Sequence, residues 1–368
     1  MADGKNGGQA TTLSIRTLLE EMIERGASDL HLTAGDRPKL RVDGELLDAT
    51  VHHMLTPKDT LHLSYSILTE NQKKRFEQDD ELDFSFGIQN LARFRGNVYR
   101  QRGCVALAIR LIPFQIQSFE ELGLPPVMRK LSERPRGLVL VTGPTGSGKS
   151  TSLAAMVDHI NKSRRGHIIT VEDPIEFIHR HHGCMVNQRE VGSDTKSFAN
   201  ALKYAMRQDP DILLVGEMRD LETIAMTITA AETGHLVLAT LHTNSAAESI
   251  NRIIDVFPSH QQSQVRAQLA FVLEGVITQT LLPRARGRGR AVACEVMVAT
   301  PAIRSVIRDD KVQQIYSIMQ AGKKHGMQTM NDALYQLYLG GDVKLEECVK
   351  RSSDPNELLR MVGEPVAS

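Results

Sequence analysis

The residues best suited to chemistry lie together in one glycine-rich stretch near the middle of the chain. Residues 143–150 read Gly-Pro-Thr-Gly-Ser-Gly-Lys-Ser and fit the pattern G-x-x-x-x-G-K-[ST] of a phosphate-binding loop. Glycines there let backbone N–H groups point inward at phosphate oxygens. Lys149 should reach the β- and γ-phosphates, and the Ser150 hydroxyl should ligate Mg²⁺. We therefore predict an ATP site formed by Gly143, Pro144, Thr145, Gly146, Ser147, Gly148, Lys149, Ser150 and Thr151.

The segments on either side of this loop are those that phosphate binding requires. Residues 137–142 are a short apolar run with β-branched side chains, which predicts a buried strand. Apolar residues then recur at helical spacing over 149–162, so the loop opens a helix whose N-terminus adds partial positive charge. A chance glycine-rich turn is the alternative, and it explains neither the strand nor the helix.

From residue 123 onward the chain alternates between strand and helix patterns, which predicts a parallel α/β sheet. Strands are expected at 137–142, 167–171, 211–216 and 235–241, and helices at 149–162, 195–207, 220–233, 244–255 and 258–273. An open sheet of this kind collects its ligand-binding groups at the carboxyl ends of its strands.

Three polar clusters are expected at that edge of the sheet. They are 167–174 with Glu172 and Asp173, 207–220 with Glu217, and 233–243, in which His235 and His242 stand at opposite ends of a strand. Glu217 follows four apolar residues, in the place where nucleotide triphosphatases keep an acid near Mg²⁺. The structural alternatives are a turn at Asp173, a helix cap at Asp220 and hydrogen-bonded histidines without a catalytic role.

Residues 12–112 are predicted to form an α+β domain with an antiparallel sheet. Helices are expected at 13–24, 57–68 and 70–77, and strands at 29–32, 39–44, 81–87, 91–101 and 103–112. The last two strands make a hairpin that carries Arg93, Arg95, Arg100, Arg102 and Arg110, with few compensating acids. Two interpretations stay open. The hairpin is a solvated edge strand whose charges prevent aggregation, or an arginine surface offered to a nucleotide on a neighbouring subunit.

The composition excludes several classes of protein. Lys+Arg and Asp+Glu both number 44, so no net charge draws the chain to nucleic acid or anionic lipid. The four cysteines form no C-x-x-C pair, which argues against a zinc site or a disulfide scaffold. The apolar runs are too short to cross a bilayer, and the first residues lack the apolar core of a signal peptide. We expect a cytoplasmic protein with no nucleic-acid partner and no membrane insertion.

The patterns also predict the domain boundaries. We expect a flexible tail over residues 1–11, the first domain over 12–112 and a linker over 113–122, where prolines and a glycine break the strand pattern. The second domain then covers 123–368 and ends in helices from about 300 to 362.

Together, these motifs resemble those of the secretion-superfamily ATPases. The phosphate loop, 171–176, 207–220 and 233–243 resemble the family's Walker A, Asp, Walker B and His boxes, and 27–32 resembles the start of its N-terminal domain. The resemblance implies an α/β protein with a PAS-like α+β N-terminal domain and a RecA-like P-loop ATPase domain with C-terminal helices. It also implies a homohexamer that hydrolyses ATP between its subunits.

Within this superfamily the chain resembles the type IV pilus retraction ATPases. It lacks the additional N-terminal domain and the tetracysteine zinc motif of extension and secretion relatives. Residues 302–309 resemble the retraction motif AIRNLIRE and depart from it at Ser305, Val306 and Asp309. The implied function is pilus retraction in twitching motility. The implied partner is the inner-membrane platform protein of the pilus machine, with this protein peripheral to that membrane at the pilus base.

The same resemblance implies roles for single residues. Glu172 and Glu217 are the candidates for orienting the attacking water and steadying the metal shell, and spacing does not separate them. In RecA-like topology the acid on the strand beside the phosphate-loop strand often handles the water, which favours Glu172; Glu217 then serves Mg²⁺ with Ser150. His242 would sense the γ-phosphate and His235 would join subunits. The implied arginines acting from the adjacent subunit are Arg95 and Arg110 in the first domain and Arg207 and Arg219 in the second.

Three other functions remain open from the sequence. The first is an ATPase for pilus extension or type II secretion. The second is a nucleic-acid translocase, although aromatic residues are only 4% with no tryptophan, which leaves few surfaces for base stacking. The third is a ring that binds ATP without hydrolysing it, and two acids with arginines around one loop argue against it.

Overall fold

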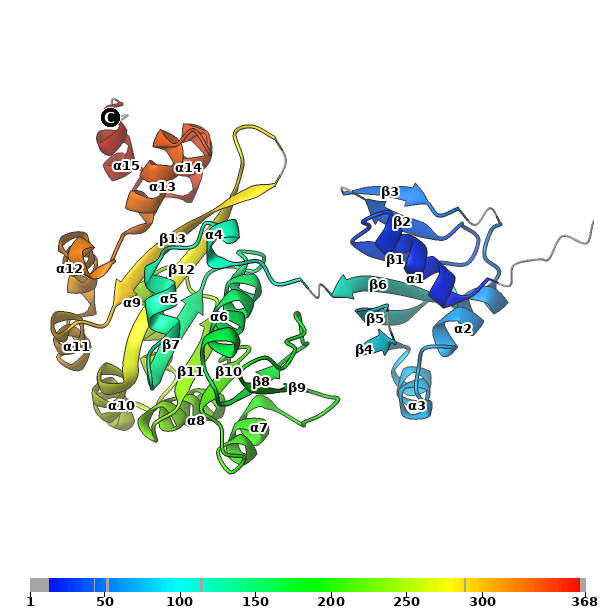
Figure 1. Cartoon of the computed structure of the whole chain (residues 1–368), viewed down its shortest axis with the longest axis horizontal. Helices are drawn as coiled ribbons and strands as arrows, with labels where there is room; N and C mark the ends of the chain where they lie inside the picture. The colour runs from blue at the N-terminus through cyan, green and yellow to red at the C-terminus, as the bar shows by residue number, and fades with distance from the viewer. Residues whose placement is uncertain are drawn as a thin grey trace, which may run out of the picture. The chain divides into compact units, whose positions relative to one another are not determined.

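The computed structural model describes residues 13–364, apart from 43, 51–52, 90, 113–114 and 288. The chain divides into two compact units, Met1–Phe114 and Gln115–Ser368. Each unit has its own sheet and its own hydrophobic core (Figure 1). The expected tail at 1–11 and Pro113 of the expected linker lie outside the described residues.

The N-terminal unit, as far as it is described, is built on a six-stranded antiparallel sheet. Its elements are α1 (Ile15–Glu24), β1 (Asp29–Leu32), β2 (Lys39–Val42), β3 (Glu45–Asp48), α2 (Pro57–Tyr65), α3 (Glu70–Asp79), β4 (Glu81–Ile88), β5 (Ala92–Gln101) and β6 (Cys104–Ile112). The strand order is β3-β2-β1-β6-β5-β4. The predicted α+β domain with an antiparallel sheet is therefore confirmed.

The arginine-bearing strands β5 and β6 are interior strands of this sheet. Successive residues of β5 alternate between core and surface, so that Phe94 is buried while Arg95 is partly exposed. Arg95 lies directly opposite Arg110 in the antiparallel register of β5 and β6. Because the edge strand on this side is β4, the interpretation of the hairpin as a solvated edge strand is wrong.

The second unit is built on a sheet with seven strands in its described part. They are β7 (Gly137–Thr142), β8 (His167–Glu172), β9 (Met185–Glu190), β10 (Ile212–Val215), β11 (Leu236–Leu241), β12 (Leu273–Pro283) and β13 (Arg290–Val298). The order is β13-β12-β7-β11-β10-β8-β9, parallel throughout except for the antiparallel pair β12–β13. The strands predicted from the sequence are confirmed as β7, β8, β10 and β11.

The sequence patterns do not predict β9, β12 and β13. The reason is clearest for β12, which starts at Leu273 directly after helix α10 ends at Val272. No turn residues separate the two elements, so the apolar pattern of the helix runs into the strand without a break. The helix expected at 258–273 matches α10 and overlaps β12 at Leu273 alone.

Helices cover both faces of the second sheet. They are α4 (Phe119–Leu122), α5 (Val127–Ser132), α6 (Lys149–Ser163), α7 (Phe198–Ala205), α8 (Leu221–Glu232), α9 (Ala246–Asp255), α10 (Ser259–Val272), α11 (Pro301–Arg308), α12 (Ile315–Ala321), α13 (Met330–Leu339), α14 (Leu345–Arg351) and α15 (Pro355–Val362), with 3₁₀ turns η1 (Val312–Gln314) and η2 (Lys323–His325). Leu138 and Leu140 of β7 join the core formed with α8 to α11, whereas Val139 and Val141 join the core formed with α5 and α6. The strand that leads into the phosphate loop is thus fixed from both sides.

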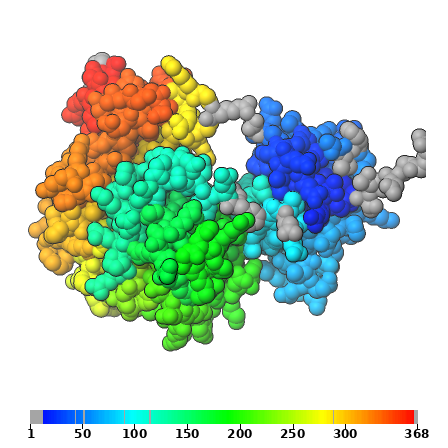
Figure 2. All heavy atoms as spheres, in the orientation of Figure 1, coloured from blue at the N-terminus to red at the C-terminus, as the bar shows by residue number. Residues whose placement is uncertain are grey.

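The last helices pack on the β12–β13 hairpin rather than on the centre of the sheet. Leu282 and Ala291 of the hairpin share a small core with Leu334, Cys348 and Leu358 of α13, α14 and α15. Figure 2 shows these helices, orange to red, grouped beside the yellow hairpin. None of the helices in the described part of the chain combines the length and apolar character needed to span a membrane.

Candidate nucleotide-binding site

The phosphate loop connects β7 to α6 in a tight turn that requires glycine at three positions. Gly143, Gly146 and Gly148 have φ angles of 139°, 78° and 88°, a region that other residues rarely adopt. Gly148 is the N-cap of α6, and no side chain hydrogen-bonds to the first backbone amides of the helix. These amides and the positive end of the helix dipole are therefore available to an anion.

Strand β12 supports the loop from one side. Gln279, which is 1% exposed, donates a hydrogen bond from Nε2 to the Ser147 carbonyl at 2.8 Å. A Cβ atom on Gly143 would lie 2.3 Å from the Gln279 carbonyl oxygen and 2.7 Å from Ser147 Oγ. Sequence reasoning missed Gln279 because its role depends on β12 lying beside β7, and no local pattern reveals that pairing.

Lys149 lies within the loop, at the first position of α6. Its ammonium donates to the carbonyl oxygens of Gly143 at 2.8 Å and Pro144 at 3.0 Å. Burial lowers the pKa of Lys149, and the charges of Glu176 and Glu217 partly oppose that shift. Two carboxylates are therefore close enough to act on the lysine. The sequence analysis placed Glu176 within the Asp box but gave it no role.

Glu217 lies just beyond the carboxyl end of β10, beside two cationic side chains. Its Oε1 atom pairs with Arg219 Nε at 2.8 Å, and its Oε2 atom lies 3.5 Å from His242 Nε2. The backbone around it is fixed by the neighbouring strand, because the Thr240 hydroxyl donates to the Gly216 carbonyl. Glu217, Arg219 and His242 thus form one cluster at the expected edge. The Asp220 carboxylate accepts a hydrogen bond from Thr223 N and so caps α8, which is the non-catalytic role that the sequence analysis considered for it.

Glu172 is the last residue of β8, and its carboxylate is held by two polar neighbours. The Thr170 hydroxyl donates to Oε1 at 2.6 Å and Gln188 Nε2 donates to the same atom at 3.2 Å. Burial is the largest influence and raises the pKa of Glu172 to about 6, despite the opposing hydrogen bonds. This carboxyl group therefore changes its protonation state close to neutral pH.

The sheet order corrects the topological argument about the two glutamates. On the side of β7 where the two glutamates lie, the strands follow in the order β11, β10 and β8. The strand next to β7 is therefore β11 and not β8. The acid nearer to the phosphate-loop strand is therefore Glu217, which follows β10, and the premise that favoured Glu172 for the attacking water is wrong. The residue just beyond the neighbouring strand β11 is His242.

Two of the candidate residues, Arg207 and His235, lie at the opposite, amino end of the strands. Arg207 comes before β10, and its guanidinium donates to the Lys203 carbonyl at 3.0 Å. His235 comes before β11, and its Nδ1 atom lies 2.9 Å from the Ala230 carbonyl oxygen. The expectation that the cluster 207–220 lies at the carboxyl edge is wrong for Arg207, because a strand separates its two ends by its full length. His235 and His242 lie at opposite ends of β11, as expected.

The candidate arginines of the N-terminal unit have acidic neighbours within that unit. The ion pairs are Arg110 with Asp29 at 2.8 Å, Arg100 with Asp80 at 2.6 Å and, more loosely, Arg95 with Asp83 at 3.9 Å. The expectation of few compensating acids is therefore wrong. The Arg110 side chain nevertheless remains 68% exposed, so its guanidinium keeps access to solvent.

The residues predicted to hold Mg²⁺ supply oxygen donors of the right kind. Ser150 offers a hydroxyl at the second position of α6, and Glu217 offers a carboxylate just beyond the carboxyl end of β10. In the described part of the chain, no group of three or more His, Cys, Asp or Glu side chains could hold a metal ion. A hydroxyl, one carboxylate and nucleotide phosphates fit Mg²⁺, which usually keeps several waters and few protein ligands.

Comparison with known proteins identifies the family. Residues 5–350 match the family model of the Type II/IV secretion system protein. The chain is 49% identical over 343 residues to the "Type IV pilus retractation ATPase PilT" of Pseudomonas aeruginosa, covering 93% of this chain and 99% of that protein. It is 44% identical over 337 residues to the "Twitching motility protein" of Neisseria gonorrhoeae, covering 90% of each.

A solved structure gives the same result. The crystal structure of the pilus retraction motor PilT with bound ADP matches with a TM-score of 0.90 and 52% sequence identity, covering 95% of this chain and 100% of that one. The chain therefore belongs to the type II/IV secretion system protein family. It is a nucleotide-binding, ATP-hydrolysing enzyme of that family, and its resemblance to the pilus retraction ATPases is confirmed.

Proposed function

We propose that this protein is a motor that hydrolyses ATP to drive the retraction of type IV pili in twitching motility. The observation that carries the proposal is the similarity, over nearly the whole chain, to relatives named for pilus retraction and twitching motility. The alternatives, an extension or secretion ATPase and a nucleic-acid translocase, have no observation of equal weight in their favour.

Hydrolysis of ATP requires placement of the γ-phosphate, an oriented water and neutralisation of the developing charge. Lys149 and the amides of the loop, from Gly143 to Thr151, hold the phosphates in this proposal. Ser150 and Glu217 hold Mg²⁺, which supplies charge neutralisation at the phosphate oxygens when it is bound. The proximity of Glu217 and His242 supports a joint role in sensing the γ-phosphate.

We propose that Glu172 orients the attacking water together with Glu217. The case for Glu172 no longer rests on topology; it rests on a buried carboxylate whose pKa is raised to about 6. Such a group is suited to accepting a proton near neutral pH. In the strand order, Glu217 lies closer to the phosphate-loop strand than Glu172 does. This favours Glu217 as the Mg²⁺ ligand, while both glutamates orient the attacking water.

The motor is proposed to be a homohexamer in which arginines complete the site of the next subunit. Arg95 and Arg110 are adjacent on one face of their sheet, which makes a paired cationic surface suited to phosphate. Arg207 lies at the amino edge of its own sheet, away from its own phosphate loop, so a role in catalysis requires a neighbouring subunit. Arg219 is held near Glu217 by an ion pair at 2.8 Å. Successive closure of subunits would act on an inner-membrane platform protein from the cytoplasmic side.

The site assignment is tested by Lys149→Ala and Glu217→Ala. Both variants should abolish phosphate release while leaving the ring intact, as measured by a phosphate-release assay and by size-exclusion chromatography. Lys196→Ala and Glu346→Ala are matched controls, because both residues are exposed and lie outside the candidate site. Wild-type turnover by either site variant would refute the assignment.

The direction of pilus movement is tested in cells. Deletion of the gene should leave more surface pili and no twitching, and the wild-type gene but not Lys149→Ala should restore motility. Loss of surface pili on deletion would indicate an extension ATPase instead. Stimulation of ATP hydrolysis by DNA, weakening as salt rises, would indicate a translocase.

A further inference from the structure

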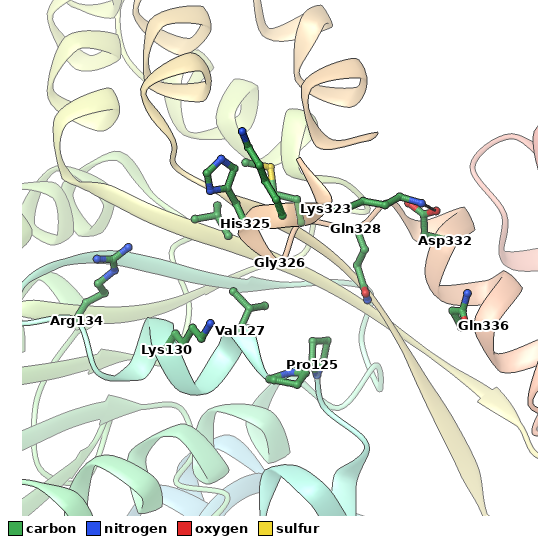
Figure 3. Close-up of a pocket in the computed structure, with 14 residues that line it drawn as sticks. Pro125, Val127, Lys130, Arg134, Lys323, His325, Gly326, Gln328, Asp332 and Gln336 are labelled. Atoms are coloured by element: carbon green, nitrogen blue, oxygen red, sulfur yellow. Dashed lines mark hydrogen bonds and ion pairs between the residues drawn. The ribbon is translucent and has the colours of Figure 1, made fainter. Parts of the chain in front are cut away.

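A cavity lies in the same unit as the phosphate loop but is built from other elements. It has a volume of about 660 Å³ and lies between α5 and the segment from Lys323 to Gln336 (Figure 3). That volume is within the usual range for sites that bind small molecules. No residue of the candidate ATP site lines it, so the nucleotide chemistry proposed above does not account for it.

The walls of this cavity are held in place by specific contacts. Gly326 has a φ of +83°, and a Cβ atom there would lie 3.0 Å from Val127 Cβ, so the turn packs closely on α5. Lys323 pairs with Asp332 at 2.9 Å, which fixes η2 against α13. Gln328 donates from Nε2 to the Cys294 carbonyl at 2.7 Å. The cavity is consequently preformed rather than a gap between mobile segments.

The charges that line the cavity are predominantly positive. The cationic or potentially cationic side chains are Lys130, Arg134, Lys323, Lys324 and His325, against the single carboxylate of Asp332. Asp332 is already paired with Lys323, and Arg134 shares Glu274 with Arg304. Within the described residues, Lys130 and Lys324 have neither a hydrogen-bond nor an ion-pair partner for their ammonium groups. The cavity therefore has an unbalanced positive charge that an anion would neutralise.

Apart from Gln328 and Gln336, the side chains that complete the lining of the cavity are apolar. Pro125, Pro126 and Val127 line one side, and Val298 and Met327 line the other. Figure 3 shows Pro125, Val127 and Lys130 along the α5 wall, facing the segment that carries His325, Gly326 and Gln328. Rigid proline rings and aliphatic side chains suit a flat ring, whereas the lysines suit phosphate oxygens.

We propose that this cavity binds a second, nucleotide-type ligand, a flat heterocycle carrying phosphate, separate from the ATP at the phosphate loop. Its phosphates contact Lys130 and Lys324, one from each wall, and its ring packs on the apolar residues. A ligand that touches both walls links α5, which follows the linker, to the C-terminal helices. Binding therefore stabilises the second unit against unfolding. The proposal does not depend on ATP hydrolysis or pilus retraction.

Calorimetric titration with guanosine diphosphate and with inorganic pyrophosphate tests the proposal. The parent protein for these titrations is the full chain with Lys149→Ala, so that the phosphate loop contributes little to binding. Guanosine diphosphate should bind with a dissociation constant below about 1 mM and more tightly than pyrophosphate, because only the former has a ring. Lys130→Gln with Lys324→Gln should weaken binding at least tenfold, since each charge-assisted contact contributes roughly 1.5–3 kcal/mol.

The matched control replaces two exposed lysines outside the cavity, Lys196→Gln with Lys344→Gln, and should bind like the parent protein. The thermal unfolding midpoint gives a second measurement, and guanosine diphosphate should raise it in the parent and the control but not in the cavity variant. No binding to the parent protein, or equal weakening in the control, would overturn the proposed site. Equal affinity for pyrophosphate and guanosine diphosphate would overturn the assignment of a nucleotide-type ligand. Each result is independent of the ATPase assay on the wild-type protein.

Discussion

Nε2 of Gln279 lies 2.8 Å from the carbonyl oxygen of Ser147, so that β12 is hydrogen-bonded directly to the phosphate loop. The same side chain packs against Gly148, where a Cβ atom would lie 3.2 Å from Nε2. Strand β12 therefore helps β7 and α6 to hold the loop in its shape.

Gln279→Ala should raise the KM for ATP by up to about tenfold with a smaller change in kcat, because a typical hydrogen bond contributes roughly 0.5–1.5 kcal/mol. Steady-state kinetics of the assembled protein measures both values. Gln279→Glu keeps the size, removes the donor and places a buried carboxylate beside the Ser147 carbonyl, so it should raise the KM at least as much as Gln279→Ala. Gln261→Ala, in an exposed position of α10, is the control and should leave the KM unchanged. An unchanged KM in both Gln279 variants would show that the hydrogen bond does not position the loop.

Gly143→Ala and Gly146→Ala should differ although both glycines lie in one loop and both have positive φ. At Gly143 the added Cβ meets the Gln279 carbonyl oxygen at 2.3 Å, whereas at Gly146 nothing lies within 4 Å. Gly146→Ala carries mainly the backbone penalty of roughly 1 kcal/mol, and Gly143→Ala must also displace β12. Nucleotide affinity, measured by calorimetry with ADP, should therefore be lost in Gly143→Ala and only reduced in Gly146→Ala. Equal losses would contradict the steric argument.

The raised pKa of Glu172 predicts opposite effects of pH on activity and on stability. The folded protein holds this proton up to about pH 6, whereas the ordinary value is 4.5. The ionised, buried form therefore costs stability of roughly 2 kcal/mol at neutral pH, and the cost disappears as the pH falls through 6 towards 4.5. ATP hydrolysis should instead decline below about pH 6, because the water-orienting carboxylate becomes protonated.

Glu172→Gln separates these effects. It should unfold at a higher denaturant concentration than the wild type at pH 7, with the difference closing at acidic pH, and it should lose most of its activity at every pH. Glu346→Gln, in an exposed position of α14, should change neither property. A wild-type rate that stays constant from neutral to acidic pH would argue against a catalytic role for Glu172.

Arg95→Ala or Arg110→Ala should lower ATP turnover by about 10³-fold or more if these arginines act as transition-state groups. Because they are proposed to act on the neighbouring subunit, mixing either variant with Lys149→Ala should restore part of the activity. In the mixed rings, some sites combine an intact loop with intact arginines. Arg102→Asn, in the turn of the same hairpin where φ is 50°, keeps the backbone conformation and should remain active. Absence of rescue would argue against action across subunits.

Local sequence patterns were sufficient to predict those elements whose defining residues are close together in the chain. The phosphate loop could be predicted because its glycines, Lys149 and Ser150 are consecutive, and because the strand before it and the helix after it have clear periodicity. The interior position of β5 could not be predicted, since it depends on β4 pairing with its far side. Strand β9 carries polar side chains at most positions, and it is a strand because of its parallel pairing with β8.

The sequence by itself determined the phosphate-binding chemistry, the α/β alternation and the identity of the acids and histidines near strand ends, because these depend on residue type and short spacing. Only the tertiary structure decided which of these residues meet. The order β7-β11-β10-β8 brings Glu217 and His242 together, and it leaves Arg207 and His235 at the far edge. The physical reason is that strand order is set by packing between segments far apart in the chain, and no local pattern of side chains encodes it.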